Sequence, residues 1–147
     1  MLKETIELES LRQKIEDAEY EWGSQSDYID RGKPNEQQKK QAQQIIARMM
    51  AKSKELKAKL HDMIVLVRRE NPQAFEDWIK IHKDFLERVL AEKKPGPRQN
   101  VARATLTEWE KVSAGDQEYI GINWYFLKDY KADVRKAFKK NPLRFWK

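Results

Sequence analysis

The sequence contains no cysteine, and this absence excludes several kinds of site at once. A disulfide framework, a thiolate zinc site, an iron–sulfur cluster and a cysteine nucleophile all require that residue. Glycine and proline are also scarce, with five of each among 147 residues. Most of them fall at a few points along the chain, and the stretches between those points are long enough to be helices. The chain is therefore expected to be a series of helices with few breaks.

Long apolar runs are missing as well. The longest, residues 63–67, has five residues, whereas a membrane-spanning helix needs about 20. The first residues mix acidic and apolar side chains and lack the cationic start and apolar stretch of a secretory signal. No stretch alternates regularly between apolar and polar residues, so no sheet is expected. Together these absences predict an all-α, soluble, cytoplasmic protein.

Apolar residues recur at spacings of three and four along most of the chain, which is the pattern of amphipathic helices. They predict helices over about residues 2–22, 34–70, 73–92 and 100–112, and a last helix from near residue 113 to about 140. The 34–70 stretch keeps its apolar residues in an arc about 100° wide, as in a coiled coil. We expect one elongated helical bundle: an antiparallel hairpin over residues 1–70 and a three-helix cluster over residues 72–147 that covers the longer arm.

The sequence offers no constellation that supports catalysis. No glycine-rich phosphate loop is present, and His61 and His82 lie on different predicted helices without a metal-ligand spacing. His82 falls on an apolar stripe, so we interpret it as a hydrogen-bonded core histidine. Asn123 is a polar residue within the predicted core stripe of the last helix. We therefore expect no catalytic residue, metal, cofactor or small-molecule substrate, and a protein that is not an enzyme.

Charge is distributed unevenly along the chain. Residues 1–30 carry nine acids and three bases, whereas residues 31–69 carry eleven bases and three acids, so the two arms of the hairpin are expected to neutralise each other. Residues 122–147 carry eight bases against two acids. This balance of +6 equals the net charge of the whole chain.

The bases of the last predicted helix form a ridge. Four of them fall within about 80° on a helical wheel, opposite the apolar stripe, and four further bases extend the ridge. The first four are Lys128, Lys131, Arg135 and Lys139, and the others are Lys136, Lys140, Arg144 and Lys147. Such a ridge is typical of a surface that binds the phosphate backbone of nucleic acid, and equally of a solvated face or a surface for an acidic protein partner.

Five apolar residues are candidates for protein contacts. Met49, Met50 and Met63 lie along the 34–70 helix, where methionine suits an adaptable partner surface, although it is more often a core filler. Phe145 and Trp146 lie in the last six residues among cations. Exposed, they would provide a stacking platform, an interfacial anchor or a peptide motif; docked, they would cover the core, which we favour because large aromatic rings are costly to leave in water.

The order of residues from 72 onward is similar in part to the HMG box, a DNA-bending module of three helices. Phe75, Trp78 and Trp109 occupy positions that resemble its aromatic residues. Glu76 and Asp77, however, place negative charge where that family presents an apolar wedge to DNA, and the loop over residues 93–100 is longer. We do not assign the chain to this family.

Two functional hypotheses follow. The first is a non-catalytic helical adaptor that acts through contacts with a protein partner or with a second copy of itself, including as a subunit of a nucleoprotein assembly. The alternative is direct binding of the nucleic-acid backbone by the basic C-terminal helix. The sequence favours the first, because the bases of the 34–70 helix have an acidic neighbour and the C-terminal ridge alone does not identify a ligand.

Overall fold

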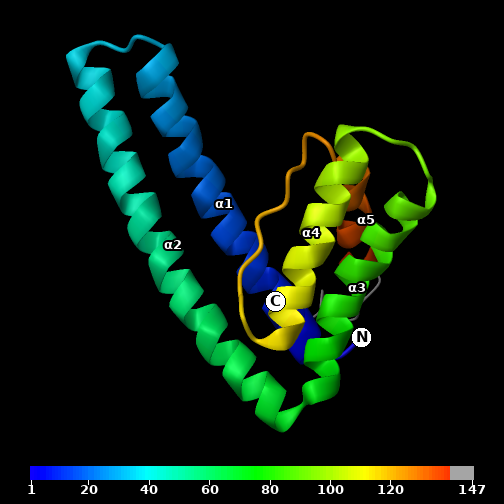
Figure 1. Ribbon diagram of the computed structural model, residues 1–147. Coiled ribbons are helices and arrows are strands. Elements are labelled where there is room, and N and C mark those ends of the chain that lie inside the picture. The colour runs from blue at the N-terminus through cyan, green and yellow to red at the C-terminus, as the bar shows by residue number, and fades with distance from the viewer. Residues whose placement is uncertain (140–147) are drawn as a thin grey trace. The chain divides into compact units, whose positions relative to one another are not determined.

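The computed structural model describes residues 1–139, and these form five helices and no strand, which confirms the all-α prediction. The helices are α1 (Lys3–Arg31), α2 (Glu36–Glu70), α3 (Pro72–Ala91), α4 (Pro97–Ala114) and α5 (Lys128–Lys139) (Figure 1). Their contacts divide the chain into two compact units. One comprises residues 10–62, and the other comprises residues 1–9 together with the chain from residue 63 onward.

The unit of residues 10–62 is a helical hairpin. Residues 10–31 of α1 and 36–62 of α2 run antiparallel, as the sequence predicted. Its apolar interior includes Ile15, Ala18, Ala42, Leu56 and Leu60. Lys57 Nζ forms an ion pair at 2.6 Å with Glu19 Oε1 across the two helices. Burial acts to raise the pKa of Glu19, but the hydrogen bonds from Lys57 and Trp22 outweigh it, and the pKa lies below its ordinary value.

The prediction that the first helix ends at residue 22 was wrong, because α1 continues to Arg31. A single glycine within a helix costs only about 1 kcal/mol, and Gly23 is accommodated. Ile29 is half-buried and continues the stripe of Trp22 one heptad later. The second helix begins at a capping box: Gln38 N–H donates to Asn35 Oδ1 at 2.8 Å, and Asn35 N–H donates to Gln38 Oε1 at 3.0 Å.

The second unit is organised around α3, which packs against α4 and α5. The residues of this helix that follow the helical spacing of three and four most closely are buried, as the periodic pattern predicts. They are Phe75, Trp78, Ile79, His82, Phe85, Leu86 and Val89. The start of α1 belongs to the same unit, where the Thr5 hydroxyl donates to the carbonyl of Ala74 at 2.9 Å.

The prediction of a long last helix was wrong. Helix α4 ends at Gly115, whose φ of 87° is left-handed. The N–H groups of Asp116 and Gly115 donate to the carbonyls of Lys111 and Val112, which closes the helix with a Schellman motif. Residues 117–123 then have no regular structure, residues 124–126 form a turn, and α5 begins only at Lys128.

Asn123 therefore does not lie on a helical core stripe. It is exposed, and its Oδ1 accepts a hydrogen bond at 3.1 Å from the backbone N–H of Tyr125. Ile120 and Leu127, which fit the helical period, are buried from the irregular segment instead, and so is Ile122. The treatment of the whole chain as one domain stays a prediction.

Candidate nucleic-acid interface

Helix α5 carries two carboxylates, and each one is paired with an arginine from another helix. Arg98 of α4 contacts both oxygens of Asp129, with Nη1–Oδ1 and Nη2–Oδ2 distances of 2.7 and 2.6 Å. Arg88 of α3 contacts Asp133 Oδ2 at 2.5 Å. A planar guanidinium can donate two parallel hydrogen bonds to a carboxylate, so the geometry of the Arg98–Asp129 pair is well defined. The acids of α5 are thus turned toward α3 and α4.

The charge state of Asp129 follows from this contact. The hydrogen bond from Arg98 lowers the pKa of Asp129 against the opposing effect of burial. A carboxyl group with a depressed pKa in the folded state stabilises the fold above its unfolded pKa, and the contribution is lost as the pH falls through the folded pKa. Asp129 therefore stays ionised and paired at neutral pH, and its charge is compensated by Arg98.

The cations of α5 are not compensated in this way. Lys128, Arg135 and Lys136 are exposed, and within residues 1–139 none of the three forms an ion pair. Lys131 is half-buried, and its Nζ lies 5.5 Å from the centre of the Trp124 ring in a cation–π contact. We refer to these four residues as the α5 cations. The predicted ridge thus has four described members, of which Lys136 extends the stripe of the other three.

The remaining predicted ridge residues are not described to the same extent. Lys139 is the last residue of α5, and its side chain lies outside the described part of the structure. Lys140 and Arg144 lie beyond residue 139, as do the predicted contact residues Phe145 and Trp146. For these residues the sequence-based predictions stand as they were.

Removing the negative charge of Asp129 should strengthen binding of a polyanion to this face. In Asp129→Asn, Arg98 keeps only the longer ion pair to Glu92, at 3.5 Å, among its contacts with carboxylates. The face gains one net positive charge, so we expect the affinity for an oligonucleotide to rise about two- to five-fold. The bidentate pair is partly exposed, so the cost in unfolding free energy should stay near or below about 1 kcal/mol. Asp62→Asn changes an exposed acid of α2 by the same charge and is the control; equal gains in both variants would contradict the local effect. Fluorescence anisotropy at about 100 mM salt measures both.

A second group of polar side chains lies in the core of the same unit. His82 Nε2 donates to Glu9 Oε1 at 2.6 Å, and Trp78 Nε1 donates to the same oxygen at 3.1 Å. In the neutral ring, His82 Nδ1 accepts a hydrogen bond from the Tyr130 hydroxyl. The His82 ring also stacks on Trp109, with centroids 4.1 Å apart. The prediction that His82 is a hydrogen-bonded core histidine is confirmed.

This Glu9–His82–Tyr130 network is closed to solvent. Glu9 is 1% exposed, and His82 and Tyr130 are fully buried. A glutamate, a histidine and a tyrosine in hydrogen-bond contact are groups that general acid–base chemistry employs, but a substrate has to reach within about 3 Å of them. The buried network ties α1, α3 and α5 together, and we assign it a structural role.

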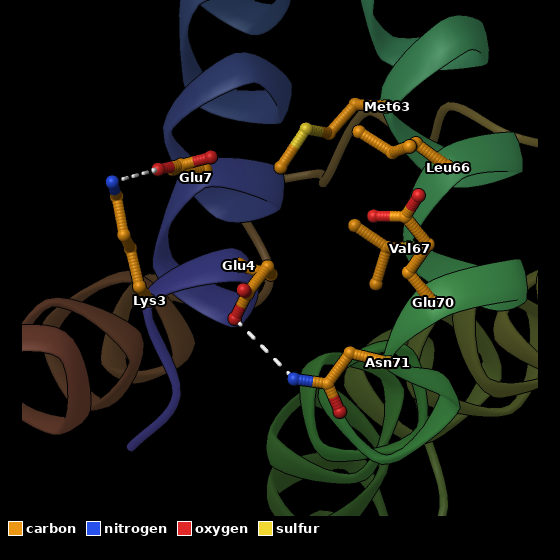
Figure 2. Close-up of a pocket in the computed structure, with 8 residues that line it drawn as sticks. All are labelled: Lys3, Glu4, Glu7, Met63, Leu66, Val67, Glu70 and Asn71. Atoms are coloured by element: carbon orange, nitrogen blue, oxygen red, sulfur yellow. Dashed lines mark hydrogen bonds and ion pairs between the residues drawn. The ribbon is translucent and has the colours of Figure 1, made fainter.

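A pocket of about 190 Å³ lies in the same unit where the start of α1 faces the end of α2 (Figure 2). Its apolar side is formed by Met63, Leu66 and Val67, and its polar side chains are Lys3, Glu4, Glu7, Glu70 and Asn71. Lys3 is 3.7 Å from Glu7, and Asn71 Nδ2 donates to Glu4 at 3.5 Å. Figure 2 shows the first contact within α1 and the second from α1 to Asn71, the residue that follows α2. Apolar and acidic groups together suit a basic or apolar side chain of another protein.

The predicted contact methionines fall in different units. Met63 lines this pocket in one unit, whereas Met49 and Met50 belong to the hairpin unit. Met49 is half-buried and Met50 is 50% exposed. Their role in protein contacts stays a prediction.

Residues 1–139 contain neither a metal-binding cluster nor a membrane-spanning helix. No group of three or more His, Asp or Glu side chains there is arranged to hold a metal ion. None of the five helices combines the length and the apolarity that crossing a bilayer requires.

The sequence revealed the cations of this face but not their surroundings. The arginine partners of Asp129 and Asp133 lie 31 and 45 residues away in the chain, and no local pattern indicates such pairs. Trp124 and Tyr125 were also missed as parts of the face, because a continuous helix had been predicted through them. The left-handed tendency of Gly115 was a signal that α4 ends there and that the next helix begins later.

No known protein family, no curated protein and no solved structure matches this chain.

Proposed function

We propose that this chain is a nucleic-acid-binding protein that contacts the sugar–phosphate backbone through the α5 cations. One observation carries the proposal: both carboxylates of α5 are paired with Arg88 and Arg98, while Lys128, Arg135 and Lys136 keep uncompensated charge on the exposed side. Pairing removes the acids that would repel phosphate and leaves the cations that would attract it.

The dimensions of the face suit such a ligand. Lys128 and Arg135 are seven residues apart on one helix, which corresponds to about 10 Å at a rise of 1.5 Å per residue. Over that length a duplex carries about six phosphate charges. A cation that neutralises a phosphate releases condensed counterions, and this release supplies most of the affinity at low salt. Sequence-independent binding with strong salt dependence is the expected behaviour.

The adaptor hypothesis is the second candidate, and the exposed apolar end of α2 favours it. Val65 is 50% and Leu66 41% exposed, and Leu66 borders the pocket that contains Met63. With its acidic side chains, this region suits a protein segment that carries basic and apolar residues. We rank the nucleic-acid proposal above the adaptor hypothesis because the uncompensated charges of the α5 cations predict a specific, measurable salt dependence of binding.

The test is fluorescence anisotropy of labelled oligonucleotides of about 20 nucleotides with the full chain over a salt series. Four phosphate contacts should give a slope of log K against log salt of about −3.6 for a duplex and about −2.8 for a single strand. Absence of binding even at about 20 mM salt would overturn the proposal, because electrostatic binding is strongest there. The search would then move to protein partners of the α2 end.

A further inference from the structure

The turn before α5 carries an exposed aromatic ring. Tyr125 is 77% exposed, the highest value among the large apolar and aromatic residues of the described chain. It stands three residues before Lys128, the first residue of α5. An aromatic ring with an open face can stack on a nucleic-acid base. The ring is the part of the face that the backbone-binding proposal does not use.

The position of this ring is set by its neighbours. The backbone N–H of Tyr125 is held by Asn123 Oδ1 at 3.1 Å, and the N–H of Leu127 donates to the carbonyl of Asn123 at the same distance. Leu127 is fully buried, so the end of the turn is anchored in the core. The ring of Phe126 meets that of Tyr125 edge to face, with centroids 4.9 Å apart and planes at 88°. Tyr125 is therefore held outward by a structured turn.

Trp124 connects this turn to the basic helix. Its ring packs against the buried Tyr130 ring at 5.6 Å, and Lys131 Nζ lies 5.5 Å from its centre. Lys131, one of the α5 cations, thus contacts Trp124, which directly precedes Tyr125 in the chain. The turn therefore carries an exposed ring three residues before the first of the α5 cations.

We infer that this face binds single-stranded nucleic acid, with a base stacked on Tyr125 and the neighbouring phosphates on the α5 cations. The inference rests on the proposed function and specifies its ligand. A single strand can turn a base face toward a protein ring, whereas the base faces of a duplex are covered by stacking. Stacking tolerates any base, so no sequence preference is expected. The shared chemistry of single-stranded DNA and RNA is what the face recognises.

The experiment compares an oligothymidylate with a hairpin duplex of the same number of phosphates, at equal salt, using the full chain. We expect the single strand to bind more tightly, and Tyr125→Ala to weaken its binding about ten-fold while changing duplex binding less than about two-fold. Tyr125→Phe keeps the ring and should restore the single-strand affinity. Tyr20 is 76% exposed on α1, so Tyr20→Ala removes an equally exposed ring and should change neither.

The outcomes separate the two proposals. Equal affinity for both ligands, with no effect of Tyr125→Ala, would overturn the single-strand inference and leave backbone binding intact. Binding of neither ligand at low salt would overturn the proposed function itself. Loss of binding to both ligands in Tyr125→Ala with a normal circular dichroism spectrum would also overturn the inference, because stacking is expected to act on the single strand alone.

Discussion

Replacing Glu9 by leucine is expected to lower the free energy of unfolding by about 3–5 kcal/mol. The carboxylate is buried and accepts hydrogen bonds from His82 and Trp78 through one oxygen. Leucine accepts neither, so two N–H donors would stay in the core without partners, and each unsatisfied donor costs about 1–3 kcal/mol. Urea denaturation followed by far-ultraviolet circular dichroism measures the change.

A matched control separates this effect from the substitution itself. Glu21 lies on the same helix and is exposed, so Glu21→Leu should change the stability by no more than about 0.5 kcal/mol. If Glu9→Leu is as mild as this control, the buried network does not hold the unit together.

A double-mutant cycle tests the contact more directly. Replacing both partners of a buried hydrogen bond by apolar groups costs less than removing one of them. Glu9→Leu combined with His82→Leu should therefore be less destabilised than the sum of the two single variants, by about 1–3 kcal/mol. Strict additivity would show that Glu9 and His82 do not act as a pair.

The parts of the fold that follow from local periodicity were predictable. Helix α3 is the clearest example, because Phe75, Trp78 and Phe85 recur at helical spacing between two breaks and are all buried. The antiparallel hairpin of the first two helices was predictable for the same reason. His82 was assigned to the core correctly because it lies on that apolar stripe.

The parts that depend on competition between local signals were not predictable in the same way. Ile120 and Leu127 are seven residues apart, a spacing that a helix would also produce, yet they are buried from an irregular segment. The Schellman motif at Gly115 stops α4, and burial of these side chains then fixes the segment. Gly115 ends a helix, whereas Gly23 does not. The helix α1 continues through Gly23 because one glycine within a helix costs little free energy.

The candidate face required contacts between distant parts of the chain. The cations of α5 are visible in the sequence, but the pairing of Asp133 with Arg88 joins residues 45 positions apart. The Glu9–His82 contact spans 73 positions. Composition cannot indicate which acids are paired with arginines within the fold. Because the acids of α5 are paired in this way, the cations of the same helix keep uncompensated charge.

Reversing two of these charges should produce the largest effect on binding. In Lys131→Glu combined with Arg135→Glu, two phosphate contacts are lost and two repulsive charges are added. We expect the affinity at about 100 mM salt to fall at least about 100-fold and the magnitude of the salt slope to fall by about 2. Fluorescence anisotropy over a salt series measures both quantities, and circular dichroism verifies that the helices persist.

The control for net charge lies on α2. Arg48 and Lys52 are exposed, four residues apart like Lys131 and Arg135, and belong to the hairpin unit. Arg48→Glu with Lys52→Glu therefore changes the net charge equally at the same spacing on another surface. If long-range attraction by the whole chain governs binding, both double variants lose affinity alike. If the α5 cations contact the phosphates, the α2 variant keeps the salt slope and loses less than about three-fold in affinity, because it removes no phosphate contact and acts only through the screened net charge of the chain.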